Sequence, residues 1–389
     1  MSSTVRVITY NVLSSAMSTP EHYPKCDPEI LDPEFRLRAI CEHLKYEIRS
    51  LSIICLQEVS ITWAAKLTTF FHERKYHFIV TNYGTRFNGY MGVAIAYPMK
   101  AFILMDVQII NVADTKKGGW GPPKPTVPPP TTLVPVPKKS TTEIFKLGFG
   151  LLWLGFASMF GVKRAFTIEM PEKRVETPWT MARYNFNRAI ILRLRTFDDI
   201  EFLICTHHLP CMFHAPSVMS IHTAMYFQAI HELSKGEVPV IVAGDFNFKP
   251  NSPQYAMVTR GDYPHGKIVD PADPETDGKE AAPPEPAYRD DPFRLEVPCV
   301  MRSAYKELCG REPEWTVKSF TERDKKLFQD TVDYVFFQTG KQASISVVSV
   351  LHHGHETDKE LGGNSLSLPG PCLHSDHVMI GANFSLVAL

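Results

Sequence analysis

Short apolar segments rich in β-branched residues recur along the whole chain, and they constrain its fold more than any other feature. Runs of this length and composition predict buried strands. A strand fixes the backbone, and its end presents a side chain to solvent. Five of these segments end in, or lead directly to, polar residues. They are Asn11, Glu58, Asp245 with Asn247, Asp333, and Asp376 with His377.

Helical segments separate the predicted strands. Apolar residues recur near the helical period in residues 34–49, and similar helices are expected over 61–71 and 217–233. Asp32 is expected to cap the first helix, and Pro33 suits its first position. The polar residues above span positions 11 to 377, which disfavours two separate domains. We therefore predict one α/β domain over residues 1–389, a packed β-sandwich with helices on its outer faces.

Two long segments interrupt this order. Residues 114–183 form a Pro-rich and apolar insertion, and residues 261–298 form an acidic, Pro-rich loop. Within the insertion, residues 147–162 hold no charge, but this stretch is shorter than the ~20 residues that a membrane-spanning helix needs. Several interpretations of residues 144–162 stay open: a helix or hairpin packed on the core, a membrane-surface contact, a protein-binding helix, or a lid over the site.

Composition limits the class of protein and its location. The net charge of −1 argues against a generally basic nucleic-acid binder, although a local basic patch remains compatible with it. The eight cysteines lack the spacing of a zinc site, so reduced thiols in a reducing compartment are the simpler interpretation. No secretory signal precedes the first strand pattern. We expect a cytoplasmic protein, with nuclear location or peripheral membrane association as alternatives.

The polar residues form a chemically consistent group. Asp245 and Asn247 lie two apart, so in extended backbone they point the same way. Asp333 places a charge in an apolar strand, which is costly unless the charge is partnered, and His377 is the natural partner. Carboxylate, amide and imidazole groups suit a hard divalent cation and a phosphate ester. Taken singly, each residue also has an ordinary structural explanation, such as a turn-forming Asn or an Asx-turn.

Further candidates lie at the ends of other strands. Arg188 opens one strand, while His207 and His208 close another, and all three are candidates for phosphate contact. One of the two adjacent histidines is expected to be structural. Phe246 and Phe248 flank Asn247 and are candidates for lining the mouth of the site.

The segments Tyr-Asn-Val, Leu-Gln-Glu-Val, Thr-His, Gly-Asp-Phe-Asn, Asp-Tyr-Val and Ser-Asp-His, in this order, resemble the endonuclease/exonuclease/phosphatase superfamily. The finer resemblance is to the carbon-catabolite-repressor-type deadenylases, nocturnin and angel. Residues 23–36 and 303–316 are similar to stretches of those proteins. Their usual Lys-x-Asp-Gly segment is replaced by Phe-Asn-Gly-Tyr-Met-Gly at 87–92, so the lysine is missing.

The resemblance implies a four-layer αββα sandwich that binds Mg²⁺ or Mn²⁺ at one end. It implies a metal-binding group made of Glu58, Asn11, Asp245 and Asp376. It also implies a catalytic group. In this group Asp245 would activate the attacking water and Asn247 would orient it. Asp333 would align His377, His377 would stabilise the charge on the phosphorus centre, and His207 would contact the scissile phosphate. The chain has no leucine-rich repeats, so docking to a deadenylase scaffold through them is not expected.

These observations give one leading hypothesis and several alternatives. The leading hypothesis is a Mg²⁺-dependent 3′–5′ exoribonuclease that hydrolyses poly(A)-type RNA with a metal-activated water. The alternatives are a phosphatase for a nucleotide or a terminal RNA phosphate, and a membrane phospholipid phosphodiesterase supported only by the apolar insertion. A non-enzymatic RNA-binding scaffold is the last alternative, but the complete set of acidic and imidazole residues argues against it.

Overall fold

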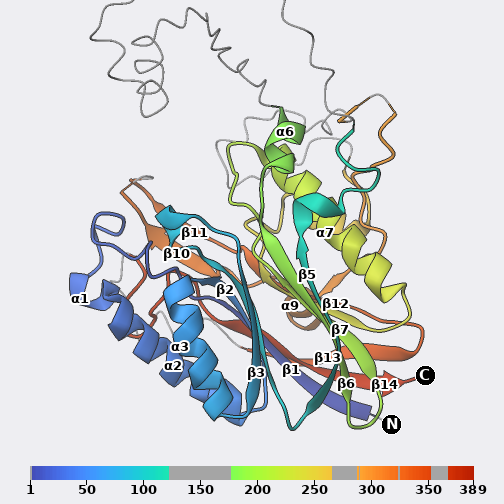
Figure 1. Cartoon of the computed structure of the whole chain (residues 1–389), viewed down its shortest axis with the longest axis horizontal. Coiled ribbons are helices and arrows are strands. Elements are labelled where there is room, and N and C mark those ends of the chain that lie inside the picture. Colours follow the sequence, from blue (N-terminus) through green and yellow to red (C-terminus); the bar gives the residue numbers. More distant parts are fainter. Residues whose placement is uncertain (1, 122–176, 265–286, 289, 323–324, 352–366) are drawn as a thin grey trace, which may run out of the picture. The chain divides into compact units, whose positions relative to one another are not determined.

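Two six-stranded mixed β-sheets form the centre of the protein (Figure 1). The structure is a computed structural model that describes residues 2–121, 177–264, 287–288, 290–322, 325–351 and 367–389. The apolar segment 144–162, with its expected contacts, lies outside the described residues, as does most of the acidic loop.

The first sheet has the strand order β13-β14-β1-β2-β4-β3. Its strands are β1 (Ser2–Asn11), β2 (Ile53–Val59), β3 (Tyr76–Asn82), β4 (Gly92–Pro98), β13 (Ala343–Val350) and β14 (Ile380–Ala388). Strands β1 and β2 are parallel, whereas the neighbouring pairs are antiparallel.

The second sheet has the order β5-β6-β7-β8-β12-β9, and here β7 and β8 are the parallel pair. Its strands are β5 (Phe102–Asn111), β6 (Arg188–Thr196), β7 (Glu201–His207), β8 (Val240–Asp245), β9 (Arg302–Ser303) and β12 (Asp333–Gln338). A separate hairpin joins β10 (Val317–Phe320) to β11 (Leu327–Asp330).

Most of the helices lie against the outer faces of these sheets, whereas Ala304 and Tyr305 of the last helix join the core between the sheets. The described helices are α1 (Pro28–Leu31), α2 (Pro33–Arg49), α3 (Ile61–Glu73), α6 (Pro178–Arg183), α7 (Pro216–Ser234), α8 (Pro253–Arg260) and α9 (Ala304–Cys309), with 3₁₀ turns η1 (Arg86–Asn88) and η2 (Val112–Thr115). As expected, Asp32 caps α2 by accepting from the backbone N–H groups of Glu34 and Phe35, and Pro33 is its first residue.

Alternation along the strands divides the core into three layers. In β1, Val5 and Val7 pack between the two sheets, whereas Ile8 and Tyr10 pack under α2 and α3. The outer face of the second sheet packs against α6 and α7 through another large apolar cluster. Successive layers of helix, sheet, sheet and helix result, which confirms the predicted αββα sandwich.

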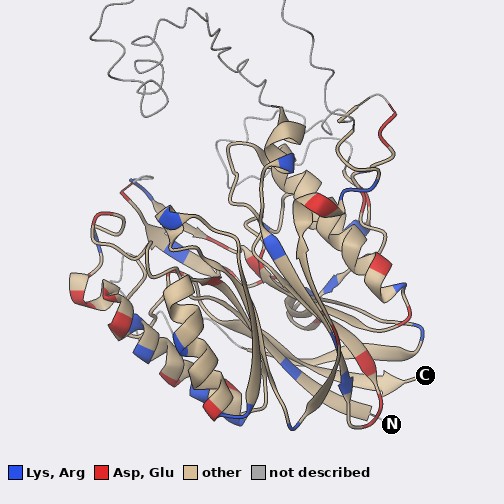
Figure 2. Cartoon of the chain, in the orientation of Figure 1, with Lys and Arg blue, Asp and Glu red and all other residues tan. Residues whose placement is uncertain are grey.

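Charged side chains lie mostly on the outer surface. Figure 2 shows Lys, Arg, Asp and Glu mixed along α2 and α3, in keeping with the net charge of −1. Within the described residues, none of the helices combines the length and the apolar character needed to cross a membrane.

Candidate active site

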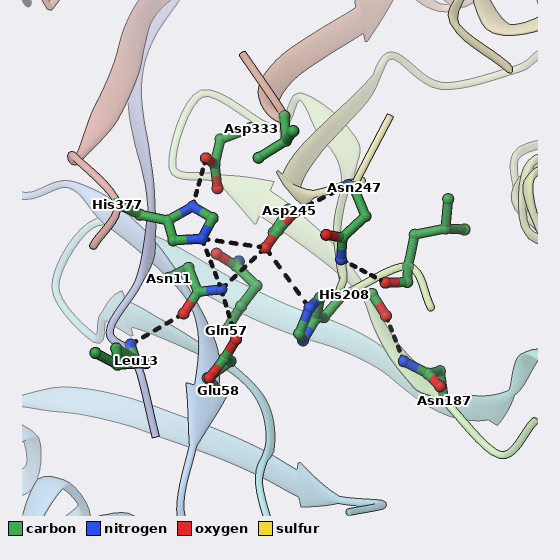
Figure 3. Close-up of polar contacts among 12 residues, drawn as sticks. Asn11, Leu13, Gln57, Glu58, Asn187, His208, Asp245, Asn247, Asp333 and His377 are labelled. Atoms are coloured by element: carbon green, nitrogen blue, oxygen red, sulfur yellow. Dashed lines mark hydrogen bonds and ion pairs between the residues drawn. The ribbon is translucent and has the colours of Figure 1, made fainter. Parts of the chain in front are cut away.

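Five of the predicted site residues meet at one end of the space between the two sheets (Figure 3). Asn11 and Asp245 are the last residues of β1 and β8, and Glu58 lies near the end of β2. Asp333 is the first residue of β12 and pairs in register with Asp245. His377 lies just before β14. Since β12 and β14 run antiparallel to β8 and β1, their beginnings meet the ends of the other strands.

Asn11 is fully buried and links the two sheets. Its Nδ2 donates to Glu58 Oε1 at 3.0 Å and to Asp245 Oδ2 at 2.9 Å. Its Oδ1 accepts from the backbone N–H of Leu13 at 3.0 Å, which fixes the orientation of the amide. A single side-chain nitrogen therefore holds carboxylates from both sheets close together.

Glu58 reaches the site through an irregularity in β2. Alternation directs Gln57 between the sheets, where it bonds Thr9 and Thr206, and would direct Glu58 outward. However, the register of β2 against β4 shifts between Gln57 and Val59, and Glu58 has a positive φ of 60°. This bulge turns the carboxylate toward Asn11, and Oε2 accepts from the Ser14 N–H at 3.0 Å.

His377 lies between two carboxylates. Its Nδ1 is 2.8 Å from Asp333 Oδ2, and its Nε2 is 3.8 Å from Asp245 Oδ2. Burial alone would lower the pKa of His377, but the two carboxylates raise it well above its usual value. Burial raises the pKa of Asp333 to about 6, while His377 opposes this effect. The ring is therefore held as an imidazolium paired with Asp333 near neutral pH.

Asn247 and His208 border Asp245 on the other side. Asn247 has a positive φ of 52°, its backbone N–H donates to Asp245 Oδ1 at 2.9 Å, and its amide donates to the Leu209 carbonyl at 2.8 Å. His208 places Nε2 3.6 Å from Asp245 Oδ2. Its carbonyl accepts from the Asn187 amide at 2.7 Å. The bond from the Asn247 N–H to Asp245 Oδ1 is the Asx-turn considered above, and it holds Asn247 beside the cluster.

The structure places His208, not His207, at the cluster, which corrects the expected role of His207. Along β7, Ile204 faces the space between the sheets, while Cys205 faces α7. Because side chains alternate along a strand, His208 lies on the same side as Ile204, and His207 lies on the same side as Cys205. Accordingly, the His207 ring packs on Tyr226 with ring centroids 4.7 Å apart. Burial lowers the pKa of His207 to about 3, so this histidine is a neutral core residue.

The expected substrate contacts of Phe246 and Phe248 are also wrong in this structure. Both side chains are buried in an aromatic cluster under the second sheet. The Phe246 ring is 5.5 Å from that of Phe336, and the Phe248 ring is 5.3 Å from that of Tyr334. Because Asp245 points between the sheets, Phe246 must point to the opposite side.

Two other candidates lie near the cluster without joining it. Arg188 is exposed at the start of β6, and its guanidinium contacts Thr81 at 3.3 Å. Asp376 accepts from the Tyr23 hydroxyl at 2.8 Å and from the Ser375 hydroxyl at 3.4 Å. The role of Arg188 in binding substrate and that of Asp376 in binding metal stay predictions.

Comparison with known proteins decides the family. Residues 8–358 match the model of the Endonuclease/Exonuclease/phosphatase family. The chain belongs to this family. A search of curated protein sequences finds no match.

Solved structures agree with this family assignment. The fold is similar to that of ANGEL2, described as a 2′,3′-cyclic phosphatase, with TM-score 0.68 at 18% identity over 99% of this chain and 95% of that one. It is also similar to the human nocturnin catalytic domain with bound sulfate (TM-score 0.55, 16% identity, 99% and 94% covered). A third likeness is to D. rerio TDP2 with a single-strand DNA product (TM-score 0.53, 13% identity, 98% and 99% covered).

The expected likeness to the angel and nocturnin proteins is thus confirmed at the level of the fold. Membership of the family supports a phosphoric ester hydrolase.

The donor set of this family member fits a divalent cation. One oxygen from each of Asp245 and Asp333 and one nitrogen of His377 lie within 4.8 Å of one another, and Asp333 Oδ1 is buried without a hydrogen-bond partner in the described structure. Both nitrogens of His377 already face carboxylates, so Glu58 and Asp245, which both accept from Asn11 Nδ2, are the residues that could hold the cation. A hard cation prefers such oxygen ligands and would relieve the repulsion between the carboxylates.

Sequence reasoning missed several residues that contact this cluster, and three of them do so through side chains. Tyr83 reaches His208 Nδ1 at 3.0 Å, Asn187 holds the His208 carbonyl, and the Thr316 hydroxyl accepts from the Asp333 N–H at 3.1 Å. Asn187 directly precedes the candidate Arg188, which was a usable signal. Tyr83 and Thr316 lie in loops that no strand pattern connects to the site.

Proposed function

We propose that the chain is a Mg²⁺-dependent phosphodiesterase that hydrolyses RNA from its 3′ end. The observation that carries this proposal is the convergence of Asn11, Glu58 and Asp245 on one side and the Asp333–His377 pair on the other. Such a site combines oxygen ligands for a hard cation with a fixed positive group for a phosphoryl oxygen.

Each side chain has a role that follows from its position. Bound Mg²⁺ would neutralise charge on the phosphate and assist deprotonation of a water. The Asp245 carboxylate can accept a proton from that water, while the Asn247 amide, fixed by the Leu209 carbonyl, orients it. The His377 imidazolium, held by Asp333, donates to the oxygen on which negative charge develops. His208 presents a second ring to the same region.

RNA as the substrate is supported by the likeness to nocturnin and ANGEL2 together with the sequence segments that resemble deadenylases. A second candidate is a phosphatase that removes a terminal phosphate from RNA or from a nucleotide. ANGEL2 is described as a 2′,3′-cyclic phosphatase, and the net charge of −1 of the present chain suits a short substrate.

One experiment separates these candidates. The purified full chain is incubated with Mg²⁺ and three 5′-labelled substrates: oligo(A) with a free 3′ hydroxyl, oligo(U) with a free 3′ hydroxyl, and oligo(A) ending in a 2′,3′-cyclic phosphate. A ladder of shortened products with release of AMP is expected from the first. If only the terminal phosphate of the third substrate is hydrolysed and no oligonucleotide is shortened, the proposed function is a phosphatase and not an exoribonuclease.

The controls test whether the described site does the chemistry. Glu58→Ala is expected to abolish turnover, whereas Glu73→Ala, an exposed carboxylate on α3, should retain it. Chelation of the metal with EDTA should stop turnover, and added Mg²⁺ should restore it. Absence of turnover with all three substrates in the unmodified chain would reject the proposed function.

A further inference from the structure

Tyr83 makes a contact across the sandwich that the proposed chemistry has not used. It follows β3 in the first sheet, whereas its partner His208 follows β7 in the second sheet. The Tyr83 hydroxyl is 3.0 Å from His208 Nδ1. His208 is 5% exposed, and Tyr83 is half-buried. The contact therefore fixes a buried ring beside Asp245 from the opposite sheet.

The hydrogen-bonding capacities around His208 determine the direction of this bond. The Asp245 carboxylate, 3.6 Å from His208 Nε2, would repel a lone pair on that nitrogen, so the electrostatics favour a proton on Nε2. In a neutral imidazole, Nδ1 is then an acceptor, and the hydroxyl of Tyr83 must donate to it. If Nδ1 carried the proton instead, the lone pair of Nε2 would face a carboxylate.

Other neighbours reinforce this arrangement. The Asn187 amide donates to the His208 carbonyl at 2.7 Å and so fixes the backbone that carries the ring. Burial, followed by the negative charges of Glu58 and Asp245, raises the pKa of Tyr83 well above its usual value. The phenol therefore keeps its proton.

We propose that Tyr83 is a positioning residue that holds His208 with its Nε2–H directed into the active site, where this N–H donates to a phosphoryl oxygen of the substrate. The proposal rests on the proposed function, because it assigns His208 to the same phosphate that Asp245 and His377 address. It extends that function by naming the residue that sets the ring nitrogen available to the substrate.

Kinetics distinguish this role from simple packing, because Tyr83→Phe keeps the ring and removes only the hydroxyl. We expect Tyr83→Phe to lower kcat/KM by about tenfold for the phosphate ester that the chain hydrolyses. In a His208→Ala background, Tyr83→Phe should have no further effect, since the group that it positions is gone. Effects that multiply fully in the double variant would overturn the proposal.

Tyr97→Phe is the matched control. Tyr97 is buried on β4, and its hydroxyl has no hydrogen-bond partner among the described residues. This variant also removes one buried tyrosine hydroxyl, but it should leave kcat/KM unchanged. Thermal unfolding of all variants shows whether a loss of activity reflects a loss of folded protein.

A second measurement does not depend on activity. The ¹⁵N shifts of the His208 ring, recognised by their absence in His208→Ala, report which nitrogen is protonated. Under mildly alkaline conditions, where an ordinary histidine is neutral, we expect the Nε2–H form in the unmodified chain and a mixture of both forms in Tyr83→Phe. A ring protonated on Nδ1 in the unmodified chain would overturn the proposal without any variant.

The two measurements separate this inference from the proposed function. If no phosphate ester is hydrolysed but the Nε2–H form depends on Tyr83, the reaction is wrong and the positioning of the ring stands. If the ester is hydrolysed and the Nε2–H form is the same in Tyr83→Phe, the reaction stands and the role of Tyr83 is wrong.

Discussion

The backbone of Glu58 is unfavourable for a side chain of its type. A non-glycine residue with φ of 60° is strained by about 1 kcal/mol, and it persists only where its surroundings hold it. Here the Asn11 amide and the Ser14 N–H both donate to the Glu58 carboxylate, and these two hydrogen bonds offset the strain of its backbone. A strained residue of this kind is expected where function, rather than stability, selects the conformation.

At the residue scale, loss of a side chain from the polar cluster should lower turnover in protein that still folds. Asp245→Ala and His377→Ala are each expected to lower kcat by ~10² or more, because they remove a ligand or the fixed positive group. His72→Ala, an exposed histidine on α3, is the control and should have the activity of the unmodified chain. Steady-state kinetics and circular dichroism measure the two properties. Near-normal kcat in either site variant would contradict the site assignment.

At the scale of elements, the parity of each strand decides which residues reach the site. Strand β8 sends Ile241, Ala243 and Asp245 between the sheets, and Val240 and Val242 toward α7. Strand β10 of the hairpin also positions the site. Val317 forms an isolated β-bridge with His377, and the Lys318 N–H donates to the Asp376 carbonyl at 2.8 Å. The loop that carries His377 is thereby fixed by backbone bonds to a neighbouring element.

Phe246 packs in the apolar cluster between the second sheet and α7, and this position gives a prediction about stability. Phe246→Ala is expected to reduce the free energy of unfolding by about 3–5 kcal/mol, because it opens a cavity in the aromatic cluster. Urea denaturation measures this change. KM of the folded fraction should stay close to that of the unmodified chain, since the ring does not reach the substrate. A raised KM with unchanged stability would restore the original expectation of a substrate contact.

At the scale of the whole molecule, two distant segments are joined by a buried ion pair. Lys116 Nζ is 2.6 Å from Asp291 Oδ1, and neither side chain is exposed. Lys116 Nζ also lies 5.7 Å from the ring centroids of Trp120 and Trp179, which lie near the two ends of the Pro-rich insertion. Asp291 lies near the end of the acidic loop and accepts from the Phe293 N–H at 3.0 Å. One charged pair thus joins the ends of the two long insertions to each other.

Removing one partner of this pair should be more harmful than removing both. Asp291→Ala is expected to lower the free energy of unfolding by about 3–5 kcal/mol, because it leaves the Lys116 ammonium buried without its counter-charge. The double variant Lys116→Met, Asp291→Leu should recover much of this loss. Chemical denaturation of the three proteins gives the comparison. A double variant no more stable than Asp291→Ala would show that the unpaired charge is not the source of the loss.

Much of this molecule was predictable from local patterns. Helix α2 with its cap at Asp32, the strands that end in Asn11 and Asp245, and the αββα order all follow from periodicity, capping and the resemblance. The choice between His207 and His208 was also within reach, since counting parity from the apolar residues of β7 selects His208. The same count would have placed Phe246 and Phe248 in the core.

The remaining features depend on contacts between distant segments. Parity alone points Glu58 away from the site, and only the bulge against β4 reverses it. The contact of Tyr83 with His208 joins loops from different sheets, and β10 is too short and too mixed in composition to be recognised as a strand. Each of these features is determined by tertiary structure, which a single sequence does not display.

The alternation of the strands has a consequence for the gene. Loss of one codon within β8 would leave every catalytic residue encoded, yet the residues after the deletion would exchange sides, and Asp245 would face α7 where Phe246 now packs. Conservative point substitutions in the same strand would spare the site. A deletion of three bases keeps the reading frame of the gene. It still reverses the two-residue alternation of side chains along the rest of β8, and this reversal alone is expected to abolish activity.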